Sequence, residues 1–191
     1  PNIFRRFGKG TRSMIGVSLV IILAKGLSEV SGELGTGVFI TDAISEYITL
    51  DVLPMLIFVV SILITVATGF SWSSMAIVMP IAFQMVIAED ATGMIPVISA
   101  AVISGAVSGE HIIPFSEKAV MSAAACKIEP VYHIKTMIFQ TLSVFMAAAG
   151  GYLIIGITGS WVLSLVVPLT FLLLIHFLFG KPNKYSKIED N

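Results

Sequence analysis

The sequence predicts an all-α membrane protein, a bundle of transmembrane helices with a re-entrant hairpin and one discontinuous helix. Two observations lead to this fold class. First, 56% of the 191 residues are hydrophobic and only 12% are charged, whereas soluble domains carry about 25% charged residues. Second, several uncharged stretches approach the length of about 20 residues that a helix needs to cross a bilayer. Two of these stretches are interrupted by glycine and hydroxyl residues.

The same composition argues against several other classes of protein. A net charge of −1 offers no basic surface for nucleic acid. The single cysteine, Cys126, excludes an internal disulfide framework. The sequence has no zinc-ligand spacing, no P-loop and no dinucleotide fingerprint. Because no pairing of a nucleophile with a base stands out either, we do not expect an enzyme.

Four apolar segments have the character of membrane spans. They are residues 13–30, 94–125, 132–155 and 160–179, of which 94–125 is broken by charged residues. Residues 52–88 form two further apolar pieces on either side of the sequence TGFSWSS at 68–74. We interpret 52–88 as a hairpin that enters and leaves the membrane on one side. A version with six crossings would place 68–74 at the cytoplasmic surface, and the absence of lysine and arginine there favours the hairpin.

Positive charge indicates the orientation of this layout. Apart from Lys25 and Lys118, the lysine and arginine residues lie within three regions, 1–12, 127–135 and 181–191. By the positive-inside rule these regions are cytoplasmic. We therefore expect a protein of the cytoplasmic membrane with both chain termini in the cytoplasm. Its parts are an N-terminal segment at 1–12, a membrane domain at 13–180 and a C-terminal tail at 181–191.

The segment 109–118, with the sequence GEHIIPFSEK, is the strongest candidate for a functional site. It places Glu110, His111, Glu117 and Lys118 between uncharged stretches at 94–108 and 119–126. An ionisable group at the centre of a bilayer costs about 2.5–3.5 kcal/mol on the insertion scale, so such groups are rare there and usually functional. Interruptions of helices at membrane depth also indicate where transporters bind their substrates. The sequence therefore predicts an ion or substrate site here.

Each of these charged residues has two interpretations. Glu110 and Glu117 can bind a cation or carry a proton; alternatively, Glu117 and Lys118 form a static ion pair that fixes the break. We favour the functional interpretation for the glutamates, because a static pair in lipid is an expensive way to fix geometry. For Lys118 the two interpretations are level. His111 can relay protons or hold the break by a hydrogen bond to a free carbonyl, and we favour the second slightly.

The hydroxyl groups of the 68–74 segment are further candidate ligands. Thr68, Ser71, Ser73 and Ser74 offer oxygen atoms that suit a hard cation or the carboxylate of a substrate. Ordinary capping of the following helix by Ser73 or Ser74 is the alternative. Both roles are open to the same residues.

The two interrupted segments carry a resemblance to a known family. Residues 68–74 and 109–118 are similar to the T-G-T-S-W-G-T and G-D-H-x-S-P-I-S-D-T motifs of NhaC-type sodium/proton antiporters, in the wider ion-transporter superfamily. The motifs follow in the same order at similar spacing, and the likeness covers roughly residues 25–156. The resemblance implies the C-terminal half of a transporter built from inverted repeats, which exchanges sodium or another monovalent cation for protons.

The resemblance also implies where ions or substrates bind and which partners are needed. The implied binding residues are Glu110, His111, Ser116, Glu117 and Lys118, together with Thr68, Ser71, Ser73 and Ser74. Beyond a sodium ion, or another monovalent cation at Glu110 and Glu117, no cofactor or metal is implied. We expect the chain to be a piece of a longer polypeptide. Its partners would be the lipid bilayer and the missing N-terminal half or another membrane chain, with a homo-oligomer as an option.

Departures from the family motifs keep other functions open. Glutamates Glu110 and Glu117 stand where the motif has aspartates, Ile113 replaces a serine, and Lys118 replaces a threonine. Lys118 can occupy the place of the cation, so the resemblance argues for a secondary transporter more strongly than for sodium. One alternative is an ion-coupled transporter or exchanger of a small organic acid or amino acid. The other is a membrane subunit that does not transport.

Overall fold

The computed structural model describes residues 49–114 and 116–179, together with the isolated positions 22, 26, 30, 33–35 and 39. The first predicted span at 13–30 lies largely outside the described residues, and so do the basic segments at 1–12 and 181–191 and the side chain of Glu117. The described elements are all helical: α3 (Leu53–Thr68), α4 (Ser71–Ala88), η1 (Thr92–Met94), α5 (Ile95–Gly109), η2 (Glu110–Ile112), α6 (Glu117–Cys126), α7 (Pro130–Thr158) and α8 (Trp161–Phe179).

Four helical segments of the described part are long and apolar enough to cross a membrane: Ser71–Ala88, Thr92–Ile112, Pro130–Thr158 and Trp161–Leu178. Helix α3 is equally apolar but shorter, with 16 residues. The prediction of an all-α membrane protein is therefore confirmed. That the α3–α4 hairpin is re-entrant stays a prediction.

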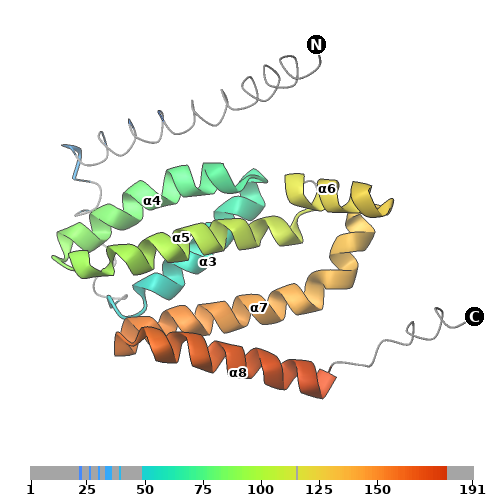
Figure 1. Ribbon diagram of the computed structural model, residues 1–191. Coiled ribbons are helices and arrows are strands. Elements are labelled where there is room, and N and C mark those ends of the chain that lie inside the picture. Colours follow the sequence, from blue (N-terminus) through green and yellow to red (C-terminus); the bar gives the residue numbers. More distant parts are fainter. Residues whose placement is uncertain are drawn as a thin grey trace, which may run out of the picture.

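The helices form two groups, which α3 joins. Figure 1 shows α4 and α5 side by side, with α3 crossing behind α5, and α7 and α8 running as a second pair. The core lies where α3, α4 and α5 meet and includes Phe58, Val86, Ile98 and Val102, all almost fully buried. The outer helix α8 buries little of its surface in the described structure.

Glycine allows α3 and α5 to approach each other closely. A Cβ atom at Gly105 would collide with the backbone oxygen of Phe58 and the Cβ of Ser61. A Cβ atom at Gly109 would lie 2.7 Å from the Cβ of Thr65. Small residues at such interfaces are typical of helix packing in membranes, where close backbone contact replaces the hydrophobic effect. Because Glu110 directly follows Gly109, this contact also positions the charged segment.

The hairpin tip is shorter than the sequence suggested. Helix α3 ends at Thr68, Gly69 takes a left-handed conformation with φ 79°, and α4 begins at Ser71 after the extended Phe70. The interruption predicted over 68–74 is thus a turn of only two residues. Pro80 lies inside α4 without ending it.

The discontinuous helix breaks at residues 110–116. After α5, one 3-10 turn (η2) ends at Ile112, and the next residue, Ile113, has an extended backbone with φ −106° and ψ 117°. The cause is Pro114, since a proline disfavours helical dihedrals in the residue before it. Helix α6 then resumes at Glu117. Its N-terminus is capped by the buried Ser116, whose hydroxyl oxygen accepts a hydrogen bond from the N–H of Ala119 at 3.3 Å.

Candidate functional site

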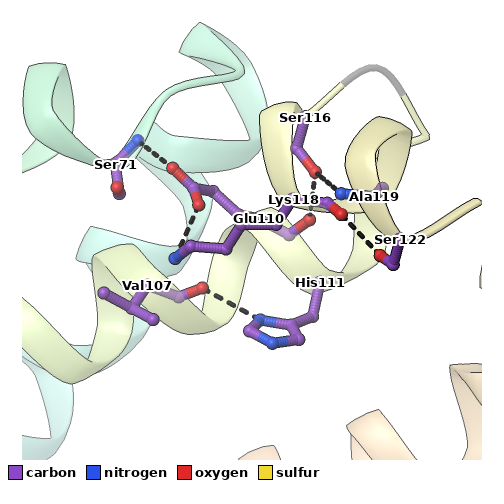
Figure 2. A network of polar contacts seen from close by, with 8 residues as sticks. All are labelled: Ser71, Val107, Glu110, His111, Ser116, Lys118, Ala119 and Ser122. Carbon is purple, nitrogen blue, oxygen red and sulfur yellow. Dashed lines mark hydrogen bonds and ion pairs between the residues drawn. The ribbon is translucent and has the colours of Figure 1, made fainter. Parts of the chain in front are cut away.

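The carboxylate of Glu110 is the centre of the candidate site. Glu110 is only 3% exposed, and each of its two carboxylate oxygens has a donor. Oε1 accepts a hydrogen bond of 2.7 Å from the backbone N–H of Ser71. Oε2 lies 2.7 Å from the ammonium nitrogen of Lys118. Figure 2 shows the carboxylate held between these two groups.

Ser71 contributes its backbone N–H because it is the first residue of α4. The first four N–H groups of a helix have no partner within it, and they carry the positive end of the helix dipole. The N-cap residue Phe70 supplies no side-chain hydrogen bond. The carboxylate of Glu110, from a residue 39 positions later, takes this role. The carboxylate of Glu110 thereby connects the turn at Gly69 to the break after α5.

Lys118 reaches Glu110 from the first turn of α6. A cation in that turn faces the positive end of its own helix dipole, which is an unfavourable place for it. The ion pair with Glu110, across the break, offsets this unfavourable interaction with the helix dipole. The two partners differ in environment: the side chain of Lys118 is 47% exposed and that of Glu110 is 4% exposed. The ammonium can therefore move away from the pair more freely than the carboxylate can.

Ser116 links the two sides of the break. Its hydroxyl donates a 2.7 Å hydrogen bond to the backbone carbonyl of Glu110, besides capping α6. Ser116 is fully buried. It therefore fixes the backbone of Glu110 relative to the helix that carries Lys118, and its role in the site is to position these two residues.

His111 lies beside Glu110 in sequence but contributes nothing to the ion pair. Its Nδ1 lies 3.0 Å from the backbone oxygen of Val107, one turn earlier. In Figure 2 the imidazole lies along α5, away from the carboxylate. This contact joins the imidazole to a backbone carbonyl of α5, and the choice between proton relay and a structural role for His111 stays a prediction.

The hydroxyl groups near the hairpin tip have other partners. Ser74 donates to the backbone oxygen of Ser61 at 2.9 Å, and Thr68 donates to that of Ile64 at 2.9 Å. Ser73 lies half-buried in the first turn of α4. The alternative interpretation, in which Ser73 or Ser74 caps α4, is wrong, because the N-cap is Phe70 and Glu110 accepts the N–H of Ser71. Of the predicted hydroxyl ligands, Ser71 therefore lies beside Glu110, whereas Thr68 and Ser74 bond backbone carbonyls of α3.

Two features of the site were not predicted from the sequence. One interpretation of the sequence pairs Lys118 with its neighbour Glu117, but the ammonium pairs with Glu110. The second feature is Thr65, which is fully buried and whose hydroxyl finds no partner among the described residues. Its usual acceptor one turn back, the carbonyl of Ser61, already receives the hydroxyl of Ser74. Neither arrangement has a local sequence signal, since both depend on helix packing.

An open pocket of about 330 Å³ adjoins the ion pair. Its charged and polar wall is formed by Glu110, Lys118 and Ser71. The rest of the wall is apolar, from Phe70, Trp72, Met75 and Val107. Among the described residues there is no group of three or more histidine, cysteine, aspartate or glutamate side chains that could hold a metal ion. The arrangement is thus an ion pair between a buried carboxylate and a half-exposed ammonium, beside an open pocket.

Comparison with known proteins shows the family of the chain. The family model described as "Na+/H+ antiporter family" matches residues 2–158. The chain belongs to the Na+/H+ antiporter family. Membership of the family indicates a transporter rather than an enzyme, in line with the apolar helices. The match includes α3 to α7 and with them the whole of the Glu110 site.

Two curated relatives are distant and longer than this chain. An uncharacterized protein of Haemophilus influenzae is 28% identical over 181 residues, which cover 95% of this chain and 35% of the relative. A malate-2H(+)/Na(+)-lactate antiporter of Bacillus subtilis is 21% identical over 112 residues, 58% of this chain and 23% of the relative. The chain thus spans about a third or less of these relatives. No solved structure matches it significantly.

Proposed function

We propose that the chain forms the ion-binding part of a secondary active antiporter of the cytoplasmic membrane. It exchanges protons for a monovalent cation, with sodium as the first candidate. The observation that carries the proposal is the buried carboxylate of Glu110, paired with the half-exposed ammonium of Lys118 beside an open pocket. This pair lies at a break in a helix that is long and apolar enough to cross the membrane.

Exchange follows from competition for one carboxylate. In one state Glu110 holds a proton, and in the other it holds the cation, so each ion displaces the other. The ammonium of Lys118 occupies Oε2 between these states and prevents an uncompensated charge in the interior. To admit a cation, Lys118 moves toward the pocket, where its side chain is already half-exposed. Ser71 keeps Oε1 in place meanwhile.

The complete transporter needs more than this chain. Transporters of this kind bind their substrates at the interface of two repeats. We propose that the rest of a longer polypeptide, or another membrane chain, completes the pocket next to Trp72, which is 45% exposed. The remaining topology belongs to the same proposal, with both termini cytoplasmic and the α3–α4 hairpin re-entrant.

Transport in proteoliposomes tests the proposal. The full-length protein that contains this chain is reconstituted with a pH-sensitive dye inside, and sodium, potassium or lithium is added outside. We expect cation entry to drive proton exit in the wild type and in Glu89→Gln, which alters an exposed carboxylate between α4 and η1. Glu110→Gln should abolish it. Exchange by Glu110→Gln at the wild-type rate would remove Glu110 from the mechanism.

A second candidate function is the ion-coupled exchange of a small organic acid or amino acid. The relative from Bacillus subtilis is named as an antiporter of malate and lactate. Lys118 also supplies a cation that the antiporter motif of the family lacks at that position. Counterflow of labelled lactate, malate and amino acids in the same proteoliposomes separates this function from cation exchange.

A further inference from the structure

Three groups meet at one point of the structure, and two of them are donors that suit an anion. The ammonium of Lys118 and the N-terminal N–H of α4 at Ser71 each lie 2.7 Å from an oxygen of Glu110. They come from different helices, α6 and α4, so their convergence is not a by-product of one element. In this structure both donors bind the carboxylate of Glu110.

The space beside these donors suits a small solute. The pocket of about 330 Å³ lies at the lower end of the range for small-molecule sites, about 300–1,000 Å³. Lys118 and Ser71 form part of its wall, and its other side chains, Phe70, Trp72, Met75 and Val107, are apolar. A short organic acid has the matching shape, with a charged end for the donors and a hydrocarbon part for the apolar wall.

We propose that Lys118 and the N-terminus of α4 form a binding site for the carboxylate of a small organic acid, which the side chain of Glu110 occupies in this structure. The inference rests on the proposed function as a secondary transporter and names a solute class for the same pocket. When Glu110 withdraws, the solute carboxylate takes over its two hydrogen bonds. We call Lys118 and the N–H of Ser71 the anion seat.

The two proposed sites share one ion pair: the anion binds on the side of Lys118, and the cation binds on the side of Glu110. A cation opens the pair by replacing Lys118 at Glu110, and an anion opens it by replacing Glu110 at Lys118. The two donors bind two oxygens of one group, a geometry that a carboxylate matches and a single halide ion does not. This is the reason to expect organic acids rather than chloride as the anion.

Removal of the carboxylate at residue 110 has opposite effects in the two cases, which provides the test. The full-length protein is purified in lipid nanodiscs, and the binding of radiolabelled lactate and succinate is measured by scintillation proximity. In Glu110→Gln the internal competitor loses its negative charge, so we expect at least one of the two acids to bind about tenfold more tightly than to the wild type. A solute that binds to the carboxylate itself, as a cation does, would bind more weakly.

Variants of the lysine complete the experiment. Lys118→Met should abolish binding of the acid, Lys118→Arg should retain it, and Lys135→Met, at an exposed lysine of α7, should leave it unchanged. Size-exclusion chromatography of each variant verifies that it is folded. Weaker or unchanged binding in Glu110→Gln would overturn the anion seat, and so would full binding in folded Lys118→Met or equal competition by chloride.

The proposed function and the anion seat can fail separately. If sodium still drives proton exit but neither acid binds wild type or Glu110→Gln, the anion seat is wrong and cation exchange stands. If the acid binds as expected but no monovalent cation drives proton movement, the seat stands and cation exchange is wrong.

Discussion

Glu110 caps a helix that begins 39 residues before it: its carboxylate accepts the N–H of Ser71 at a distance of 2.7 Å. The hairpin tip between α3 and α4 and the break between α5 and α6 are therefore parts of one structure. Any event that moves this carboxylate frees the N-terminus of α4 and the ammonium of Lys118 together. The ion binding proposed at Glu110 would thus be coupled directly to the packing of the hairpin.

Replacement of Glu110 by glutamine should abolish coupled flux while the protein still inserts into the membrane. The amide keeps the size of the side chain but cannot exchange a cation for a proton. It also leaves the Lys118 ammonium without its partner, so the variant should be somewhat less stable. Flux in proteoliposomes and the melting temperature in detergent measure the two effects. Glu89→Gln, at an exposed position, is the matched control.

Replacement of Ser116 by alanine should reduce transport without removing any charge. The hydroxyl bridges the carbonyl of Glu110 and the N–H of Ala119, so its loss uncaps α6 and loosens the backbone at the break. Loss of such a cap costs about 1 kcal/mol. We expect a lower melting temperature and a reduced maximal rate, with the same ion preference.

Ser122→Ala is the control for Ser116→Ala. Its hydroxyl is exposed and bonds only the carbonyl of Lys118 one turn back within α6, so its removal should change neither measurement. If both variants transport equally well, the bridge through Ser116 does not position the site.

Replacement of Gly109 by alanine should displace Glu110. The new Cβ would lie 2.7 Å from the Cβ of Thr65 and 2.9 Å from the backbone oxygen of Ile62. Neither atom can move without shifting α3, and overpacking of this kind costs about 1–3 kcal/mol. We expect weaker ion binding and a lower melting temperature. Gly150→Ala on α7, where the new Cβ would meet nothing within 4 Å beyond its chain neighbours and the nearby backbone of its own helix, should leave both unchanged.

The sequence was sufficient for the class of fold and for the position of the break. Long uncharged stretches indicate membrane helices whatever their packing, and Pro114 stops the helix by acting on the adjacent Ile113. Glu110 stood out because an acid between apolar segments is expensive in a membrane. These arguments depend only on residues that are close together in the sequence, so they need no knowledge of the tertiary structure.

The partners within the site could not be predicted in the same way. Adjacency suggested Glu117 for Lys118, and the local capping rule suggested Ser73 or Ser74 for α4. In the structure Lys118 pairs with Glu110, and the hydroxyl of Ser74 donates a hydrogen bond to the carbonyl of Ser61 on α3. Both outcomes depend on how α3, α4 and α6 cross, which spacing along the chain does not encode. The proposed role of Glu117 remains a prediction from sequence.

Replacement of Lys118 by threonine should create or strengthen dependence on sodium. In the wild type the ammonium already neutralises Glu110 at 2.7 Å, so an entering sodium ion must displace it and gains less free energy than it would at an unpaired carboxylate. Threonine removes this competitor and restores the hydroxyl of the family motif. Sodium titration of both proteins at a fixed proton gradient measures the effect. If sodium drives the wild type and the variant alike, Lys118 does not stand in the place of the bound cation.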